Sequence, residues 1–143
     1  MKKSHNVSCV IYHIVCPVKY RKKAINQYVA QTVKYVCVEI QKRYEIHYIE
    51  IGIDEDHVHF LVQSVPNLSP REIVQITKSI IARTVFAEHP EVKAELWGGQ
   101  FWTSGYYVNT VGKHGNENII SHYVKNQGYT YRQIHRDQLT LFN

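Results

Sequence analysis

Two histidines separated by one residue, His57 and His59, can hold a metal ion if they lie on a β-strand. Side chains at positions i and i+2 of a strand project from the same face, about 6 to 7 Å apart. Two imidazoles placed in this way can bind one divalent cation from one side, while Val58 points to the opposite face. The same pair is also compatible with two strand histidines that have purely structural partners, and the spacing alone does not separate these interpretations.

A second candidate pair, Tyr123 and Gln127, lies on a predicted helix over residues 116–127. At about 100° per residue, both side chains fall within the apolar stripe that includes Ile119 and Ile120. A buried amide needs hydrogen-bond partners. An inward glutamine one turn after a tyrosine therefore fits a metal ligand beside a nucleophile, although an ordinary core tyrosine also fits this helix.

Together the two pairs indicate a reaction on a phosphodiester. A cation held by His57 and His59, with Gln127 as a further ligand, would polarise a phosphoryl oxygen. The Tyr123 hydroxyl would attack phosphorus, and it needs a nearby cation because the phenol pKa is about 10. A new hydroxyl can reverse the phosphotyrosine link without ATP, and the chain has no P-loop motif.

The elements that must position these residues alternate between strand and helix patterns. The predicted strands cover residues 7–16, 46–53, 57–64 and 106–111, and the predicted helices cover 24–43, a segment starting at 69–72, and 116–127. Asp54 to Asp56 form an acidic turn between the second and third strands, which indicates a hairpin. This order predicts an α+β, ferredoxin-like sandwich: a four-stranded antiparallel sheet with two helices on one face and a C-terminal catalytic helix.

The composition is that of a globular chain, which excludes fibrous, wholly disordered and membrane-spanning classes. Its 143 residues predict a single domain, residues 1–143, that can form a core without metal or disulfides. No apolar run approaches the roughly 20 residues of a membrane span, and no signal peptide is expected. The three cysteines are odd in number and lack metal-ligand spacing, so we expect reduced thiols in a cytoplasmic protein.

The net charge of +5 favours a polyanionic partner, most often nucleic acid. The densest basic cluster follows the first strand: Lys19, Tyr20, Arg21, Lys22 and Lys23. Such a loop can bind phosphates and stack a base on its tyrosine, although a solvated helix start has the same composition. Arg43 and Lys78 are further candidates for this contact. The aromatic residues of the glycine-containing loop are expected to be core or subunit contacts: Trp97, Phe101 and Trp102.

Four segments in this order resemble the small single-tyrosine HUH transposases of the IS200/IS605 insertion-sequence family. They are residues 57–59, 96–102, 105–112 and 123–127. Residues 19–22 after the first strand are also similar to that family. The resemblance extends over about residues 7–128.

The resemblance implies an HUH core that acts on single-stranded DNA and recognises hairpins near the ends of the element. It implies Mg²⁺ or Mn²⁺ bound by His57, His59 and Gln127, with Asp54 as an acid near the metal. It implies that Tyr123 forms a 5′-phosphotyrosine and releases a 3′-hydroxyl. It also implies a homodimer, in which the tyrosine helix of one subunit can complete the metal site of the other.

Two other functions are compatible with parts of this pattern. One is an inactive or domesticated relative that only binds hairpin DNA or RNA, but such a protein does not need the histidines, Tyr123 and Gln127 together. The other is an HUH nickase that initiates replication or conjugation. Those enzymes usually carry additional domains, which 143 residues cannot hold.

Overall fold

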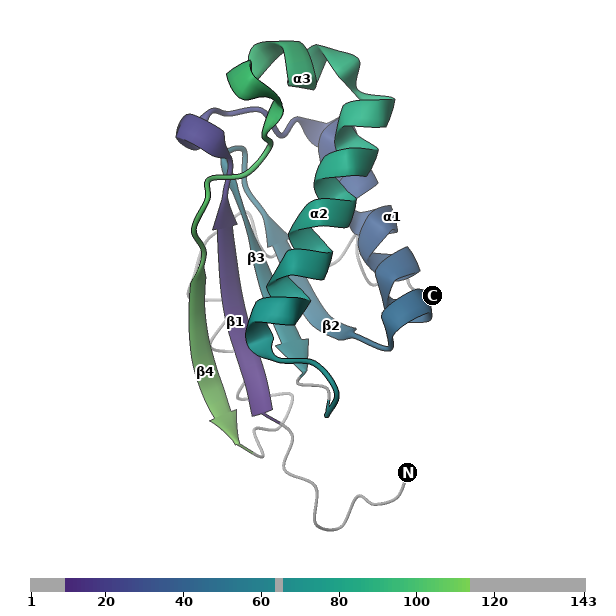
Figure 1. Cartoon of the computed structure of the whole chain (residues 1–143), viewed down its shortest axis with the longest axis vertical. Helices are drawn as coiled ribbons and strands as arrows, with labels where there is room; N and C mark the ends of the chain where they lie inside the picture. Colours follow the sequence, from purple (N-terminus) through teal and green to yellow (C-terminus); the bar gives the residue numbers. More distant parts are fainter. Residues whose placement is uncertain (1–9, 64–65, 114–143) are drawn as a thin grey trace.

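The computed structural model describes residues 10–63 and 66–113 (Figure 1). The elements follow in the order β1 (Val10–Pro17), a 3-10 turn η2 (Lys19–Arg21), α1 (Gln27–Tyr44), β2 (His47–Ile53), β3 (His57–Gln63), α2 (Pro70–Glu88), α3 (Pro90–Glu95), a 3-10 turn η3 (Trp97–Gly99) and β4 (Tyr107–Lys113). The predicted helix over residues 116–127 lies outside the described residues.

The four strands form one antiparallel sheet in the order β2-β3-β1-β4. β1 and β3 occupy the centre, and their register pairs Val15 with His59 and Pro17 with His57. α1 and α2 both lie over the same face of the sheet (Figure 1). This arrangement confirms the predicted α+β, ferredoxin-like fold for the described residues.

The apolar core fills the space between that face and the two long helices. Alternate strand residues and the inward stripes of the helices supply it: Ile14, Cys16, Val33, Val36, Ile40, Val58, Phe60, Val62, Ile73, Ile81 and Val85. Because side chains alternate along β3, Val58 points into this core while His57 and His59 project from the other face. The sequence therefore predicted correctly that Val58 faces the core and that His57 and His59 lie on the opposite face of β3.

The start of α1 is set by Asn26, whose side chain accepts hydrogen bonds from the backbone N–H groups of Tyr28 and Val29. This is a typical N-cap, so the helix begins at Gln27 and not at the predicted residue 24. The helix ends where Glu45 adopts a left-handed conformation with φ of 60°.

α2 starts within the predicted segment 69–72, and a capping box sets this start. Ser69 accepts from the backbone N–H of Glu72, the Glu72 carboxylate accepts from the backbone N–H of Ser69, and Pro70 occupies the first turn. α2 ends at Glu88, and Pro90 begins the short helix α3. The reason is the same as for Pro70, since proline is well accommodated at a helix start.

β4 continues to Lys113, two residues beyond the predicted strand 106–111. Lys113 pairs with Val10 and Gly112 pairs with Ile11, so the start of β1 supplies partners for these residues. In the described part of the chain no helix is long and apolar enough to cross a membrane. Cys16 and Cys37 are buried free thiols, as expected, and burial raises the pKa of Cys16 to about 12.

Candidate functional site

His57 and His59 form one cluster at the start of β3, on the face of the sheet opposite the two long helices. Their Nε2 atoms lie 2.9 Å apart. The ring centroids are separated by 4.7 Å and the ring planes are inclined by 68°, so the two Nε2 atoms face each other. The sequence predicted correctly that the two histidine side chains project from the same face of a strand.

Acidic residues of the turn before β3 orient His57. Asp56 Oδ1 lies 2.7 Å from His57 Nδ1, and Asp54 Oδ2 lies 3.5 Å from His57 Nε2. Burial tends to raise the pKa of the Asp56 carboxyl, but the hydrogen bond with His57 and the charge of Arg21 outweigh it and lower the pKa overall. Asp56 is therefore an ionised acceptor for Nδ1, which leaves Nε2 of His57 directed toward His59.

A third histidine, His13 on β1, joins this cluster although the sequence pattern did not single it out. It is 3% exposed, and its Nε2 lies 2.9 Å from His59 Nδ1. The alternation of β1 places His13 on the histidine side of the sheet, because Ile14 and Cys16 face the core. That signal was available in the sequence, but the contact with His59 depends on the pairing of β1 with β3.

Burial keeps the inner histidines neutral. The pKa of His59 is lowered to about 3, mainly by burial and further by the neighbouring His57 and His13. Burial also lowers the pKa of His13. Since neutral imidazole is the form that binds metal, His59 does not have to lose a net proton to become a ligand at neutral pH.

The separation of His57 and His59 fits a single octahedral cation. Two ligand atoms bound at right angles, each at about 2.1 Å from a cation, lie about 3 Å apart, and the two Nε2 atoms are separated by 2.9 Å. Within residues 10–63 and 66–113, no group of three or more histidine, cysteine, aspartate or glutamate side chains is arranged to hold a metal ion. The described residues thus supply two imidazoles, with Asp54 beside them, and a complete site needs a further ligand. Gln127, the predicted ligand, and the predicted nucleophile Tyr123 lie outside the described residues.

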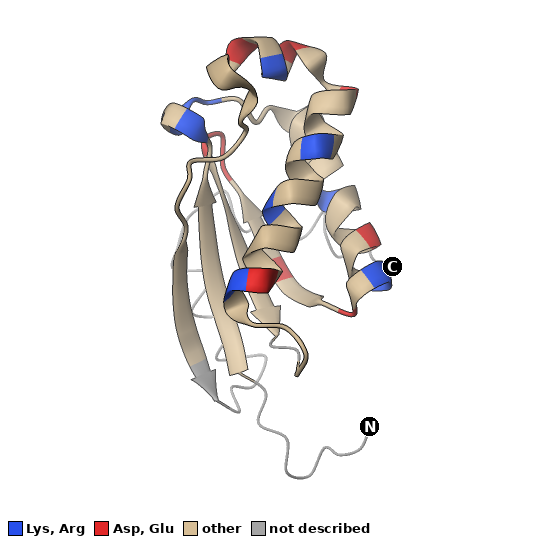
Figure 2. Cartoon of the chain, viewed as in Figure 1, with Lys and Arg blue, Asp and Glu red and all other residues tan. Residues whose placement is uncertain are grey.

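The predicted basic cluster lies at the same end of the sheet as the histidines. η2 follows β1 directly, and the backbone N–H of Val18 donates to the carbonyl of Asp56 at 2.8 Å. Arg21 Nε lies 3.3 Å from Asp56 Oδ2, so an ion pair connects the cluster to the residue that orients His57. Figure 2 shows the cations of η2 next to the acidic turn before β3. Lys22 and Lys23 are exposed.

The basic cluster contains one exposed aromatic residue and lies beside another. Tyr20 is 64% exposed and Trp97 is 80% exposed. Together with Lys22 and Glu95 they line one open pocket. The Lys19 ammonium lies 5.3 Å from the centroid of the Tyr20 ring. Flat rings beside several cations form a surface that suits an unpaired base with its phosphate.

The exposure of Trp97 excludes a core position, one of the two expected for it, and leaves the subunit contact as a prediction. Leu96 is fully buried, and Gly98 and Gly99 both have positive φ angles, of 85° and 69°. The chain therefore turns sharply after Leu96, which leaves the indole outside the core. Phe101 and Trp102 are buried, as expected.

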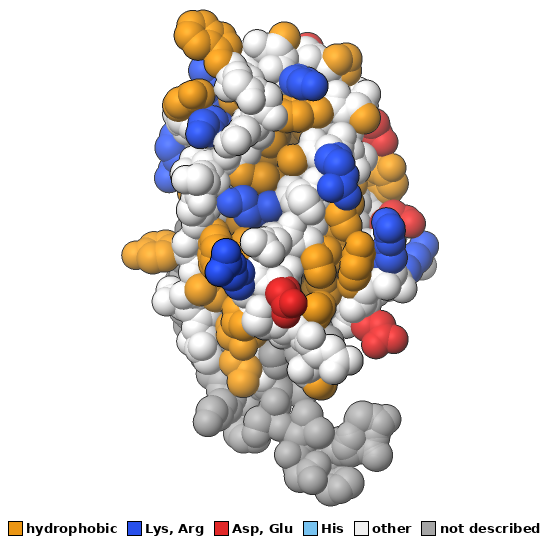
Figure 3. Space-filling model, in the orientation of Figure 1, with side chains coloured by type: hydrophobic (Ala, Val, Ile, Leu, Met, Phe, Trp, Pro, Cys, Tyr) orange, Lys and Arg blue, Asp and Glu red, His pale blue; other side chains and the backbone are white. Residues whose placement is uncertain are grey.

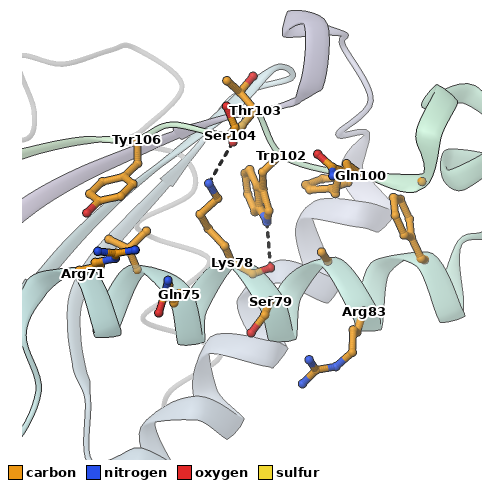
Figure 4. Close-up of a pocket in the computed structure, with 15 residues that line it drawn as sticks. Arg71, Gln75, Lys78, Ser79, Arg83, Gln100, Trp102, Thr103, Ser104 and Tyr106 are labelled. Carbon is orange, nitrogen blue, oxygen red and sulfur yellow. Dashed lines mark hydrogen bonds between the residues drawn. The ribbon is translucent and has the colours of Figure 1, made fainter.

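A groove lies on the helix side of the molecule, between α2 and residues 99–106 (Figure 4). Figure 3 shows lysine and arginine side chains around its apolar floor. Lys78 crosses the groove and donates to the carbonyl oxygens of Thr103 at 2.9 Å and Gly105 at 3.2 Å. Trp102 Nε1 donates to the carbonyl of Lys78 at 3.0 Å. Lys78 thus connects α2 to the segment before β4, a structural role that the sequence did not reveal.

Comparison with known proteins gives a consistent family relationship. A family model described as IS200-like transposase matches residues 6–127. The ISDra2 transposase TnpA of Deinococcus radiodurans is 30% identical over 116 residues, which cover 81% of this chain and 82% of that protein. The transposase for insertion sequence element IS200 of Salmonella typhimurium is 28% identical over 116 residues, which cover 81% of this chain and 75% of that protein.

Two solved structures share the fold. A crystal structure from Deinococcus radiodurans, assigned as a transposase, has a TM-score of 0.70 at 29% identity and covers 89% of this chain and 98% of that chain. A REP-associated tyrosine transposase bound to a REP hairpin has a TM-score of 0.56 at 8% identity and covers 87% of this chain and 67% of that chain. At 8% identity the likeness concerns the fold alone.

Proposed function

Because this chain belongs to the family of IS200-like transposases, we propose that it cleaves and rejoins single-stranded DNA through Tyr123 and a divalent cation. The observation that carries the proposal is the 2.9 Å approach of the Nε2 atoms of His57 and His59. An ionised Asp56 orients one ring, and burial keeps the other neutral. This arrangement suits a pair of metal ligands at neutral pH.

His57, His59 and Gln127 would hold Mg²⁺ or Mn²⁺, with the Asp54 carboxylate adding negative charge beside them. Imidazoles combined with oxygen donors suit Mn²⁺, and Mg²⁺ can use the same set if it retains several waters. When bound, the cation would polarise a phosphoryl oxygen and favour the phenolate form of Tyr123.

The Tyr123 oxygen attacks the scissile phosphorus. A bond between that oxygen and phosphorus forms as the bond to the 3′ oxygen breaks, the phenol loses its proton, and the departing oxygen becomes a 3′-hydroxyl. The product is a 5′-phosphotyrosine. A 3′-hydroxyl of another DNA end then attacks the same phosphorus, which restores both a phosphodiester and the free tyrosine. One phosphoester bond replaces another in each step, so the cycle needs no ATP.

The basic cluster would guide the strand to this site. Lys19, Arg21, Lys22 and Lys23 supply charge for phosphates. Tyr20 and Trp97 would stack on unpaired bases near the histidines. One structural neighbour is bound to a REP hairpin, and we extend to this chain the recognition of DNA hairpins.

We further propose a homodimer with shared active sites. β4 lies at the edge of the sheet, and none of the described strands pairs with its outer side. Tyr107 and Val108 on this strand are 71% and 36% exposed. An exposed edge strand is a surface for pairing with another chain. Light scattering should detect a dimer, and a monomer that still cleaves DNA would contradict the shared-site arrangement.

The experiment that tests the function is cleavage of labelled single-stranded hairpin oligonucleotides with Mg²⁺, Mn²⁺ or a chelator. We expect cleavage only with metal, and its loss in His57→Ala and His59→Ala. His47→Ala is the matched control, because His47 is an exposed histidine on β2. Cleavage that persists in the chelator would remove the metal site, and binding without any cleavage would favour the hairpin-binding alternative.

A further inference from the structure

His13 stands in a chain of contacts that leads into the proposed metal site. The chain runs from Asp56 to His57 Nδ1 at 2.7 Å, from His57 Nε2 to His59 Nε2 at 2.9 Å, and from His59 Nδ1 to His13 Nε2 at 2.9 Å. Both ring nitrogens of His59 therefore have an imidazole partner. His13 is the member farthest from Asp56, and it is the most deeply buried histidine of the three.

The contact between His13 and His59 has the geometry of a hydrogen bond in the plane of both rings. The rings are inclined by only 11°, and their centroids are 5.1 Å apart. With 2.9 Å between the two nitrogens, those atoms lie on the line between the centroids, so the rings meet edge to edge and are not stacked face to face. Such a contact fixes the orientation of the His59 ring, and the tautomers of the two histidines decide which ring donates.

Proton positions in the metal-free chain follow from Asp56, which can only accept. With one proton on each imidazole, His57 donates through Nδ1 to Asp56 and accepts at Nε2. His59 then donates through Nε2 to His57 and accepts at Nδ1 from His13. All three hydrogen bonds run in one direction, and the Nε2 lone pair of His59 is not available to a cation in this state.

We propose that His13 is a positioning residue of the metal site, which accepts a hydrogen bond from His59 Nδ1–H when Nε2 of His59 binds the cation. This inference rests on the proposed function. Binding through Nε2 requires the proton of His59 to be on Nδ1, so the hydrogen bond to His13 reverses. His13 then carries its own proton on Nδ1 and presents the lone pair of Nε2 to His59. Each ring keeps one proton, so the three histidines release no net proton.

The expected consequence is a large effect of His13 on metal affinity. Removing the partner of a metal-binding histidine typically costs 10- to 100-fold in affinity. His13→Leu leaves the Nδ1–H of His59 without its acceptor in a buried position. His13→Gln retains a carbonyl oxygen that can accept the same hydrogen bond, so it should restore part of the lost affinity. His47→Leu is the matched control, since it removes an exposed histidine on β2.

The test uses the full chain without DNA and measures Mn²⁺ binding from the electron paramagnetic resonance signal of the free ion. We expect His13→Leu to bind Mn²⁺ about 10- to 100-fold more weakly than the unmodified chain, His13→Gln to lie between them, and His47→Leu to bind normally. Circular dichroism checks that each variant is folded.

A second measurement on the unmodified chain does not depend on the folding of a variant. Nitrogen-15 NMR of the imidazoles distinguishes the two neutral tautomers, and Mg²⁺ is diamagnetic. Saturation with Mg²⁺ should move the proton of His59 from Nε2 to Nδ1, and that of His13 from Nε2 to Nδ1. Unchanged tautomers in the Mg²⁺-saturated chain would overturn the inference.

The outcomes distinguish the role of His13 from the proposed function. Mn²⁺ binding that is lost in His59→Ala but unchanged in folded His13→Leu would overturn the role of His13 and leave the proposed function intact. If Mn²⁺ binding does not depend on His57 or His59, the metal site itself is refuted, and the role of His13 with it.

Discussion

Protonation of His59 gives a test of the site that requires neither DNA nor metal. The pKa of this imidazole falls from 6.5 to about 3 on folding. Because the folded pKa is the lower one, the unfolded chain takes up the proton first as pH decreases. The contribution of His59 to stability is therefore complete above pH 6.5 and is lost progressively as pH falls toward 3.

The magnitude follows from the difference in pKa. Each pH unit below the unfolded pKa costs about 1.4 kcal/mol while the folded imidazole remains neutral. At pH 5 the loss attributable to His59 is thus about 2 kcal/mol. This is a substantial part of the roughly 5 to 15 kcal/mol by which a typical domain is stable.

The assay is urea unfolding in the presence of a chelator at pH 8 and pH 5, for the unmodified chain and for His59→Asn. The variant removes the titrating ring and leaves the other titratable side chains in place. Its free energy of unfolding should therefore fall about 2 kcal/mol less than that of the unmodified chain between the two pH values. His47→Asn, which removes an exposed histidine, should behave like the unmodified chain. Equal pH dependence of His59→Asn and the unmodified chain would refute the assignment of a buried, neutral His59.

Three further predictions concern other parts of the molecule. Tyr20→Ala and Trp97→Ala should each weaken binding of a short single strand by about 5- to 150-fold, since stacking on one base contributes about 1 to 3 kcal/mol. Fluorescence anisotropy measures this, with the exposed Tyr28 on α1 as the control position, and unchanged affinity would exclude stacking at Tyr20 and Trp97. Ser69→Ala should lower the free energy of unfolding by about 1 kcal/mol without changing DNA affinity, and no loss of stability would mean that the capping box contributes nothing. Phe60→Ala should cost about 3 to 5 kcal/mol in urea unfolding, because its side chain is fully buried beneath the helices, and a cost below 1 kcal/mol would contradict that packing.

Local patterns predicted much of the fold. The alternation in β3 correctly separated Val58 from the two histidines, and the residues from Ser69 to Glu72 correctly located the start of α2. These signals are readable because they act over a few residues. The order of elements was sufficient to predict the sheet topology, since one helical crossover joins β1 to β2 and another joins β3 to β4.

The sequence did not predict features that depend on long-range pairing. The contact of His13 with His59 follows from the register between β1 and β3, which joins residues 46 positions apart. Trp97 has a large apolar ring of the kind usually found in a protein core. Only the backbone conformations of the two glycines after it place the indole outside the core. The role of Lys78 likewise depends on carbonyl groups of a segment 25 or more residues away.

The most direct test of the central claim is the search for a covalent complex between the chain and single-stranded DNA. Labelled hairpin oligonucleotides, incubated with the chain and Mg²⁺ or Mn²⁺, should give an adduct on a denaturing gel that is absent with a chelator. Mass spectrometry should locate the 5′-phosphate on Tyr123, and Tyr123→Phe should retain DNA binding and form no adduct. An adduct that persists in Tyr123→Phe, or cleavage that leaves no DNA attached to the chain, would contradict the mechanism.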